Sequence, residues 1–283
     1  MWSFQDEINF FKNALDGDFA NKEDLFYQID NKYFSYIPRE IRGKIPTLQS
    51  RNSLIGRYTE NWCCNLLRNI AEKFGLYAVN GVVCNELGLN TSSCADLAFC
   101  TTNSKNQSPQ NIKLIFEIKM SIVNQYEFLN GEVSYLGNHK THKGLPSLTR
   151  SDSMLKAIGK SISIRVNSEY SRNIPIIIIG NTHISNNYLE KVDHLGQSGV
   201  LQKVISVNPN LDEIKNSPLN YFCTPSDLNE LEEILKTILS NDLYYFSAMI
   251  SKSRLSDIIK QSSDCRNEIE IAETFFKLLE GKK

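Results

Sequence analysis

Apolar residues recur at four-residue steps between positions 54 and 74, so one helix is expected to carry them as a single buried stripe: Leu54, Tyr58, Trp62, Leu66, Ile70 and Phe74. Ser53 is a suitable N-cap for this helix, and Gly75 is suited to end it. Similar spacing predicts further helices over about 151–166, 186–195 and 225–239. Residues 2–34 are also expected to be helical, and the last 40 residues to form two more helices.

Short apolar runs between these helices predict strands over 77–84, 94–101, 112–120, 174–180 and 204–207. The run from Ile174 to Ile179 is almost entirely isoleucine, as expected of a strand that is buried on both faces. Residues 102–111 are polar and are expected to connect two strands of a hairpin in solvent. Residues 36–53 and 121–150 are polar or rich in turn-forming residues, so we expect them to be irregular loops.

The predicted order of elements is helix, three strands, helix, strand, helix, strand. It indicates an α/β fold with a mixed central β-sheet flanked by helices on both sides. The chain of 283 residues has no internal repeat and no clear linker, so we expect one domain. Its core would span about 54–207, with a helical and basic extension over 1–53 and a helical region over 225–283.

Composition and the N-terminus narrow the class of protein. No apolar run approaches the roughly 18 to 20 residues that cross a bilayer, and the first residues contain neither a basic leader nor an apolar signal core. We therefore expect a cytoplasmic protein that does not contact membranes. Its seven cysteines are irregularly spaced, which indicates neither a disulfide scaffold nor a zinc site. No glycine-rich phosphate-binding motif occurs, so no nucleotide cofactor is expected.

The net charge is −1, but basic residues concentrate in two zones of the sequence. The first zone, residues 37–57, contains a single acid, Glu40, and five basic residues: Arg39, Arg42, Lys44, Arg51 and Arg57. The second zone, residues 138–172, contains two acids and seven basic residues: Lys140, Lys143, Arg150, Lys156, Lys160, Arg165 and Arg172. Such clustering suits a polyanionic partner, although two basic faces exposed to solvent would produce the same pattern.

The strand expected over 112–120 carries the most informative residues of the chain. Glu117 and Lys119 are two positions apart and therefore lie on the same face, opposite an apolar set: Leu114, Phe116, Ile118 and Met120. Asp96 lies on the strand expected before it. Two carboxylates can hold Mg²⁺ beside a phosphodiester, and a lysine can stabilise the charge that develops there. The alternative is a cluster of cross-strand ion pairs with a purely structural role.

This arrangement resembles the PD-(D/E)xK nuclease superfamily, in which an aspartate begins the second strand of a hairpin and Glu-x-Lys follows on the next strand. The predicted elements over 54–180 have the order of that superfamily's core, whereas the leading proline of the motif is replaced by Ala95. The resemblance implies a restriction-endonuclease-like fold, Mg²⁺ as cofactor, Asp96 and Glu117 as its ligands, and Lys119 as a catalytic residue. It also implies a glutamate from the preceding helix. Glu60 is the candidate, and it would lie either at the site or on the surface.

Within that superfamily the chain is most similar to type II restriction endonucleases, because its size suits a stand-alone enzyme and it lacks an ATPase motif. The resemblance implies sequence-specific hydrolysis of double-stranded DNA by a homodimer. The candidate DNA-binding residues come from the two basic zones: Arg39, Arg42, Arg51, Lys140, Lys143, Arg150 and Lys156. A repair or recombination nuclease of the same fold and a non-catalytic DNA-binding protein are the alternatives.

Two pairs of residues in the second basic zone are secondary candidates. His139 and His142 have a spacing that could chelate a metal, but no third ligand is near in the sequence, and contact with phosphates is the favoured interpretation. Lys156 and Lys160 are one helical turn apart and can face the same way. Lys156 could contact a phosphate or be an ordinary surface lysine.

Overall fold

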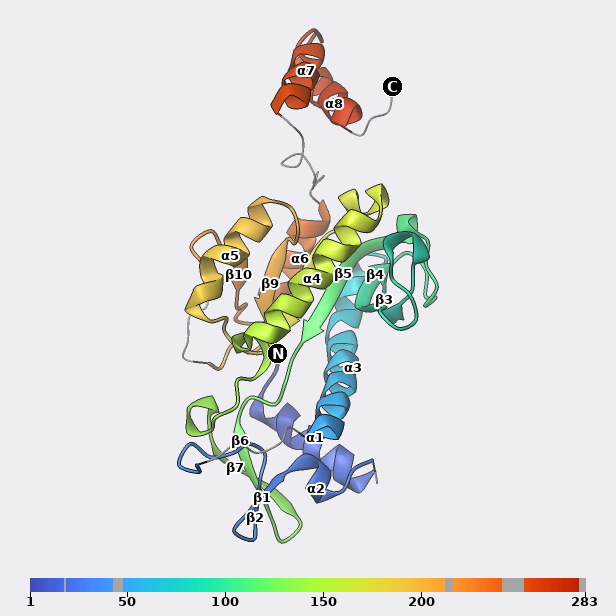
Figure 1. The fold of residues 1–283 in the computed structure, drawn as a ribbon. Helices are drawn as coiled ribbons and strands as arrows, with labels where there is room; N and C mark the ends of the chain where they lie inside the picture. Colours follow the sequence, from blue (N-terminus) through green and yellow to red (C-terminus); the bar gives the residue numbers. More distant parts are fainter. Residues whose placement is uncertain (18, 43–47, 212–215, 241–251, 280–283) are drawn as a thin grey trace.

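The computed structural model describes residues 1–17, 19–42, 48–211, 216–240 and 252–279. A six-stranded sheet lies at its centre (Figure 1), and its strands, in spatial order, are β10 (Phe222–Cys223), β9 (Lys203–Ser206), β8 (Ile176–Gly180), β5 (Ile112–Lys119), β4 (Ala95–Cys100) and β3 (Tyr77–Val82). β3, β4 and β5 form an antiparallel meander, whereas β5, β8, β9 and β10 run parallel. The predicted mixed sheet is therefore confirmed. No helix in the described ranges is long and apolar enough to cross a membrane.

Helices cover both faces of this sheet, as predicted (Figure 1). On one face, α3 (Gln49–Lys73) and α6 (Leu228–Ser240) pack in the same buried cluster as Phe116 of β5. On the other face, α4 (Ser151–Asn167) packs on β5 and β8, and α5 (Asn186–Gln197) packs on β8 and β9. Full burial of a side chain such as Phe116 stabilises the fold by about 2–3 kcal/mol, so the two layers hold β5 firmly from either side.

Most predicted elements are present, with shifted ends. α3 begins at Gln49, so Ser53 lies inside the helix and not at its N-cap. Gly75 follows the helix with a φ of 69°, a left-handed conformation that glycine adopts without strain, and this confirms its role as the stop. Two further helices, α7 (Lys252–Ser262) and α8 (Glu268–Leu279), pack against each other, as expected for the C-terminal region.

A second, four-stranded antiparallel sheet was not predicted. Its strands, in spatial order, are β1 (Tyr27–Ile29), β2 (Lys32–Phe34), β6 (Gln125–Leu129) and β7 (Glu132–Gly137). The prediction of helix throughout 2–34 is wrong, because α1 (Phe4–Asp16) and α2 (Lys22–Leu25) are followed by the β1–β2 hairpin. The prediction that 121–150 is irregular is also wrong, because β6 and β7 lie within it.

Both hairpins of this second sheet turn on residues with positive φ. Asp30 and Asn31 have φ of 48° and 65°, and Asn130 and Gly131 have φ of 52° and 85°. Two successive left-handed residues match the right-handed twist of the adjoining strands, which is why Asn-Gly is a strong hairpin signal. The sheet packs on α1 and the first turns of α3 through Phe11, Ile55 and Tyr126.

Candidate functional site

The candidate site begins where β4 and β5 stop pairing. The antiparallel ladder ends with the pair Leu97 and Phe116, and two residues further along β5 the Ile118 N–H donates to Asp96 Oδ2 at 2.7 Å. The Asp96 carboxylate thus replaces the backbone of β4 as the acceptor and is fixed beside β5. On its other edge β5 remains paired with β8 as far as Lys119 and Gly180.

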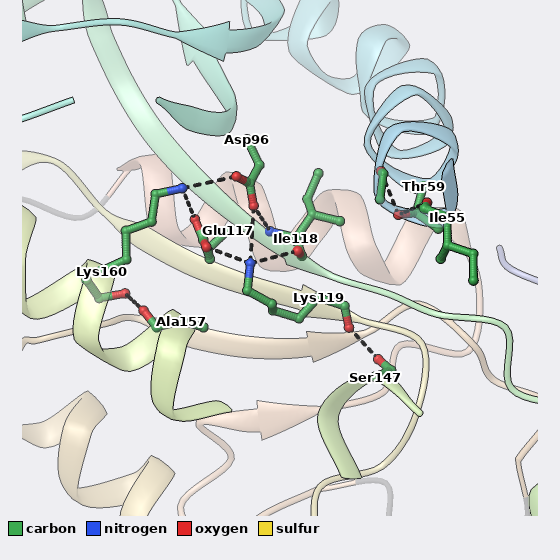
Figure 2. Close-up of polar contacts among 11 residues, drawn as sticks. Ile55, Thr59, Asp96, Glu117, Ile118, Lys119, Ser147, Ala157 and Lys160 are labelled. Atoms are coloured by element: carbon green, nitrogen blue, oxygen red, sulfur yellow. Dashed lines mark hydrogen bonds and ion pairs between the residues drawn. The ribbon is translucent and has the colours of Figure 1, made fainter. Parts of the chain in front are cut away.

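β5 alternates as its sequence predicts. Leu114, Phe116, Ile118 and Met120 belong to the cluster beneath α3 and α6. Glu117 and Lys119 lie on the opposite face, where α4 crosses the sheet (Figures 1 and 2). The Ser147 hydroxyl donates to the Lys119 carbonyl at 2.5 Å and so fixes the position of the end of β5. The two-residue period of a strand is therefore what brings the acid and the amine together.

Asp96, Glu117, Lys119 and Lys160 form one carboxylate–lysine cluster (Figure 2). Lys119 Nζ lies 2.6 Å from Glu117 Oε1 and 3.5 Å from Asp96 Oδ2. Lys160 Nζ, which comes from α4, lies 2.6 Å from Glu117 Oε2 and 3.0 Å from Asp96 Oδ1. The structure thus brings together the three residues that the sequence selected and adds Lys160, which sequence reasoning did not place at the site.

Burial and charge determine the protonation states within this cluster. The Glu117 side chain is 7% exposed, and the Lys119 side chain is 21% exposed. Burial, reinforced by the charge of Asp96, raises the pKa of Glu117 above its usual value. Burial also acts to raise the pKa of Asp96, but the ammonium groups of Lys119 and Lys160 and the Ile118 amide outweigh it, so this pKa is lowered. Burial acts to lower the pKa of Lys160, but the charges of the Asp96 and Glu117 carboxylates outweigh burial, so this pKa is raised.

Two carboxylate oxygens of the cluster converge on one cation. Asp96 Oδ1 lies 3.0 Å and Glu117 Oε2 lies 2.6 Å from the same ammonium nitrogen of Lys160, so both oxygens surround one position. Mg²⁺ prefers oxygen ligands, and one or two carboxylates together with phosphate and water oxygens are enough to hold it. The donor set formed by Asp96 and Glu117 therefore fits a magnesium ion.

Glu60 of α3 does not complete a set of three ligands. Among the described residues, no group of three or more His, Cys, Asp or Glu side chains is placed to hold a metal ion. Glu60 is partly buried, and this burial, followed by the charge of Asp96, raises its pKa. It therefore belongs to the electrostatic surroundings of the cluster without joining the convergent pair.

The fold brings the two basic zones of the sequence side by side. Pro38 and His142 form an isolated antiparallel bridge. Next to it the Arg39 N–H donates to the Thr141 carbonyl at 3.3 Å, and the Lys143 N–H donates to the Ile37 carbonyl at 3.0 Å. Segments about a hundred residues apart thus form one surface.

A cavity of about 710 Å³ adjoins the cluster between α3, α4 and the end of β5. Lys119 belongs to both the cluster and the cavity wall. Of the six charged residues that line the cavity, Asp152 is the only acid, and the other five are basic: Arg51, Lys119, Lys143, Arg150 and Lys156. The cavity is thus an electropositive space that opens onto the candidate catalytic lysine.

The seven candidate DNA-binding residues differ in their surroundings. Lys143, Arg150 and Lys156 are exposed and line the cavity, whereas Arg39, Arg42 and Lys140 are exposed outside its wall. Arg51 is 3% exposed, and its guanidinium donates to the carbonyls of Leu25 and Ser35. Arg51 therefore holds the second sheet to α3 and has little surface left for a nucleic acid. Lys44, from the same zone, lies outside the described residues.

His142 is unsuited to both roles considered for the histidine pair. Its side chain is fully buried, Nε2 lies 2.9 Å from the Val123 carbonyl, and Nδ1 accepts the Gly144 N–H at 3.0 Å. Both ring nitrogens are thus engaged, which leaves none for a metal or a phosphate. Burial lowers the pKa of His142 to about 4, so the ring is neutral at pH 7 with its proton on Nε2.

Comparison with protein-family models, curated proteins and solved structures finds no match to this chain. The carboxylate–lysine cluster and the basic surface beside it are therefore the features that indicate a function.

Proposed function

We propose that this protein is a Mg²⁺-dependent endonuclease that hydrolyses phosphodiester bonds of double-stranded DNA in the manner of a type II restriction enzyme. The observation that carries the proposal is the convergence of Asp96 Oδ1 and Glu117 Oε2 on a single cationic nitrogen, with Lys119 Nζ 2.6 Å from the same Glu117 side chain. Paired acids and a lysine at the open end of a sheet strand are the groups that this reaction requires.

Each residue of the cluster has a defined part in that chemistry. Asp96 and Glu117 would hold the magnesium ion, which, when bound, supplies charge neutralisation at the phosphate and a water of lowered pKa. Lys119 faces the cavity and would stabilise the negative charge that develops on the phosphate oxygens. The Ile118 N–H keeps Asp96 oriented, so the acid does not have to reorganise when a substrate arrives.

The surroundings of the cluster support a polyanionic substrate. Lys143, Arg150 and Lys156 line the cavity next to Lys119, and Arg39, Arg42 and Lys140 extend the basic surface beyond it. Contacts from such residues to phosphates provide affinity without choosing a sequence. Base recognition and a two-fold symmetric dimer belong to the proposal because a palindromic site would require both.

One observation favours a second candidate, a DNA-binding protein whose cluster is structural. Each ammonium contacts both carboxylates, so two positive and two negative groups already satisfy one another. A buried network that is fully paired can persist for structural reasons alone. This candidate predicts DNA binding through the same basic surface and no Mg²⁺-dependent cleavage.

The test is incubation of the purified protein with phage DNA and supercoiled plasmid, with Mg²⁺ or with a chelator. We expect discrete fragments from the wild type with Mg²⁺, none from Lys119→Met, and an unchanged pattern from Lys113→Met, a control for an exposed lysine of the same strand. Degradation from strand ends or at branched junctions would instead indicate a repair nuclease. Retained DNA binding without any cleavage would establish the second candidate.

A further inference from the structure

Lys160 occupies the position where the two carboxylates converge. Its Nζ contacts Glu117 Oε2 at 2.6 Å and Asp96 Oδ1 at 3.0 Å, and 19% of its side chain is exposed. α4 places it there because Ala157, Ser161 and Ile164 are buried on the same side of the helix, one turn or less from Lys160. Lys156, one turn earlier, is 71% exposed and pairs with Asp152.

The two lysines of the cluster are held differently. Lys119 extends from β5 itself and donates to the Ile118 carbonyl at 3.0 Å in addition to its carboxylate contacts. Lys160 reaches the cluster from another layer of the fold, and its ammonium is bound to the two carboxylates. A metal cation that binds to Asp96 and Glu117 would therefore displace Lys160 more easily than Lys119.

We infer that Lys160 holds the cation position between Asp96 and Glu117 until a divalent cation displaces it. The displaced ammonium then binds a phosphate oxygen of the DNA. This inference rests on the proposed function. Two cations cannot share one pair of carboxylate oxygens without strong repulsion. An ammonium that has lost both partners in a largely buried site requires another anion. The backbone phosphates of a duplex held beside the Lys119 cavity would supply it.

The inference makes cation binding and DNA binding favour each other. Without DNA, a divalent cation must displace Lys160 and leave the ammonium unpaired, so the affinity of the protein for the cation is low. With DNA, a phosphate receives the released ammonium, so the affinity for the cation rises. Because such coupling is reciprocal, the cation raises the affinity for DNA by the same factor. Lys160 is thereby a positioning residue that delays assembly of the site until the substrate is present.

The first test measures Mn²⁺ binding to DNA-free protein by titration calorimetry. We expect Lys160→Met to bind Mn²⁺ at least about tenfold more tightly than the wild type, because the internal competitor is gone. Lys113→Met, which removes an exposed lysine of β5 outside the cluster and the cavity wall, is the control and should bind Mn²⁺ as the wild type does. Lys160→Gln, which keeps a hydrogen-bond donor for the carboxylates, serves if Lys160→Met does not fold, as judged by thermal unfolding.

The second test measures the salt dependence of affinity for a 30-base-pair duplex in a Lys119→Met background, where no cleavage is expected. With Mn²⁺, the slope of log K against log salt should be steeper by about 0.9 when Lys160 is present than in Lys160→Met, because one more phosphate is neutralised. Without Mn²⁺, the two slopes should agree, because Lys160 is then bound to Asp96 and Glu117. Equal slopes with Mn²⁺ would overturn the inference.

The outcomes separate this inference from the proposed function. If the wild type cleaves DNA and Lys160→Met binds Mn²⁺ no more tightly than the wild type, the role of Lys160 is refuted and the nuclease stands. If Lys160→Met binds Mn²⁺ tightly but the wild type cleaves no DNA, the role of Lys160 in holding the cation position is supported and the nuclease is refuted. If neither protein binds Mn²⁺ and the wild type cleaves no DNA, both are refuted.

Discussion

The carboxylate of Asp96 accepts the backbone N–H of Ile118 at 2.7 Å, at the point where β4 stops pairing with β5. A side chain thus completes the hydrogen bonding of a sheet edge and, at the same time, presents its second oxygen to Lys160. The same geometry that ends the ladder therefore creates the candidate cation site. Asp96 consequently has a structural role that can be separated from its chemical one.

Asp96→Ala should lower the free energy of unfolding by about 2–3 kcal/mol, because it leaves the Ile118 N–H without its acceptor and both ammonium groups with one carboxylate fewer. Asp96→Asn keeps an acceptor and should destabilise the protein less than Asp96→Ala does. Urea denaturation of the three proteins measures the difference. Both variants should lose Mg²⁺-dependent cleavage, and equal stability of the two would refute the structural role of the Ile118 hydrogen bond.

Glu60 and Glu117 should differ sharply in their effect on cleavage. Glu117 is one of the two acids that converge on the cation position, so Glu117→Gln should slow single-turnover cleavage by at least about 100-fold. Glu60 is outside that pair, and Glu60→Gln should cost less than about tenfold through the electrostatic surroundings alone. Comparable losses in the two variants would show that Glu60 is a third ligand.

Much of the candidate site could be predicted because a strand has a fixed period. A strand over 112–120 places Glu117 and Lys119 on one face, and the neighbouring strand over 94–101 carries Asp96. Lys160 was not selected, because the spacing of Lys156 and Lys160 does not say which of them faces the sheet. The small or apolar residues Ala157, Ser161 and Ile164 mark the buried side of α4, and they could have identified Lys160 as the inward lysine.

The second sheet could not be predicted from local spacing to the same extent. β2 pairs with β6 through Tyr33 and Phe128, which are far apart in the sequence, so neither strand is complete without a distant partner. The turn Asn130-Gly131 is a local hairpin signal, but the strands beside it are short and partly polar, a composition that also predicts a loop. The density of basic residues over 37–57 likewise does not distinguish Arg51, which is buried, from its exposed basic neighbours.

Arg51 and Arg150 should behave as a structural and a DNA-contacting arginine, respectively. Arg51 is 3% exposed and donates to backbone carbonyls, so Arg51→Met should lower the free energy of unfolding by about 3 kcal/mol. Arg150 is exposed on the cavity wall, so Arg150→Met should leave stability within about 0.5 kcal/mol. In Arg150→Met the slope of log K for DNA against log salt should fall by about 0.9. A loss of DNA affinity in folded Arg51→Met that matches that of Arg150→Met would contradict this division.

His142 should make the stability of the protein depend on pH below neutrality. Burial of the ring favours its neutral form in the folded state, so the pKa of His142 falls from 6.5 to about 4. In this neutral form Nδ1 accepts the Gly144 N–H. The stabilisation is complete above about pH 6.5, and it is lost as pH falls towards 4, because the unfolded chain takes up the proton first. The loss amounts to about 3 kcal/mol at most, and urea denaturation at several pH values measures it. His142→Gln should flatten this part of the curve. A slope that persists in His142→Gln would assign the pH dependence to another group.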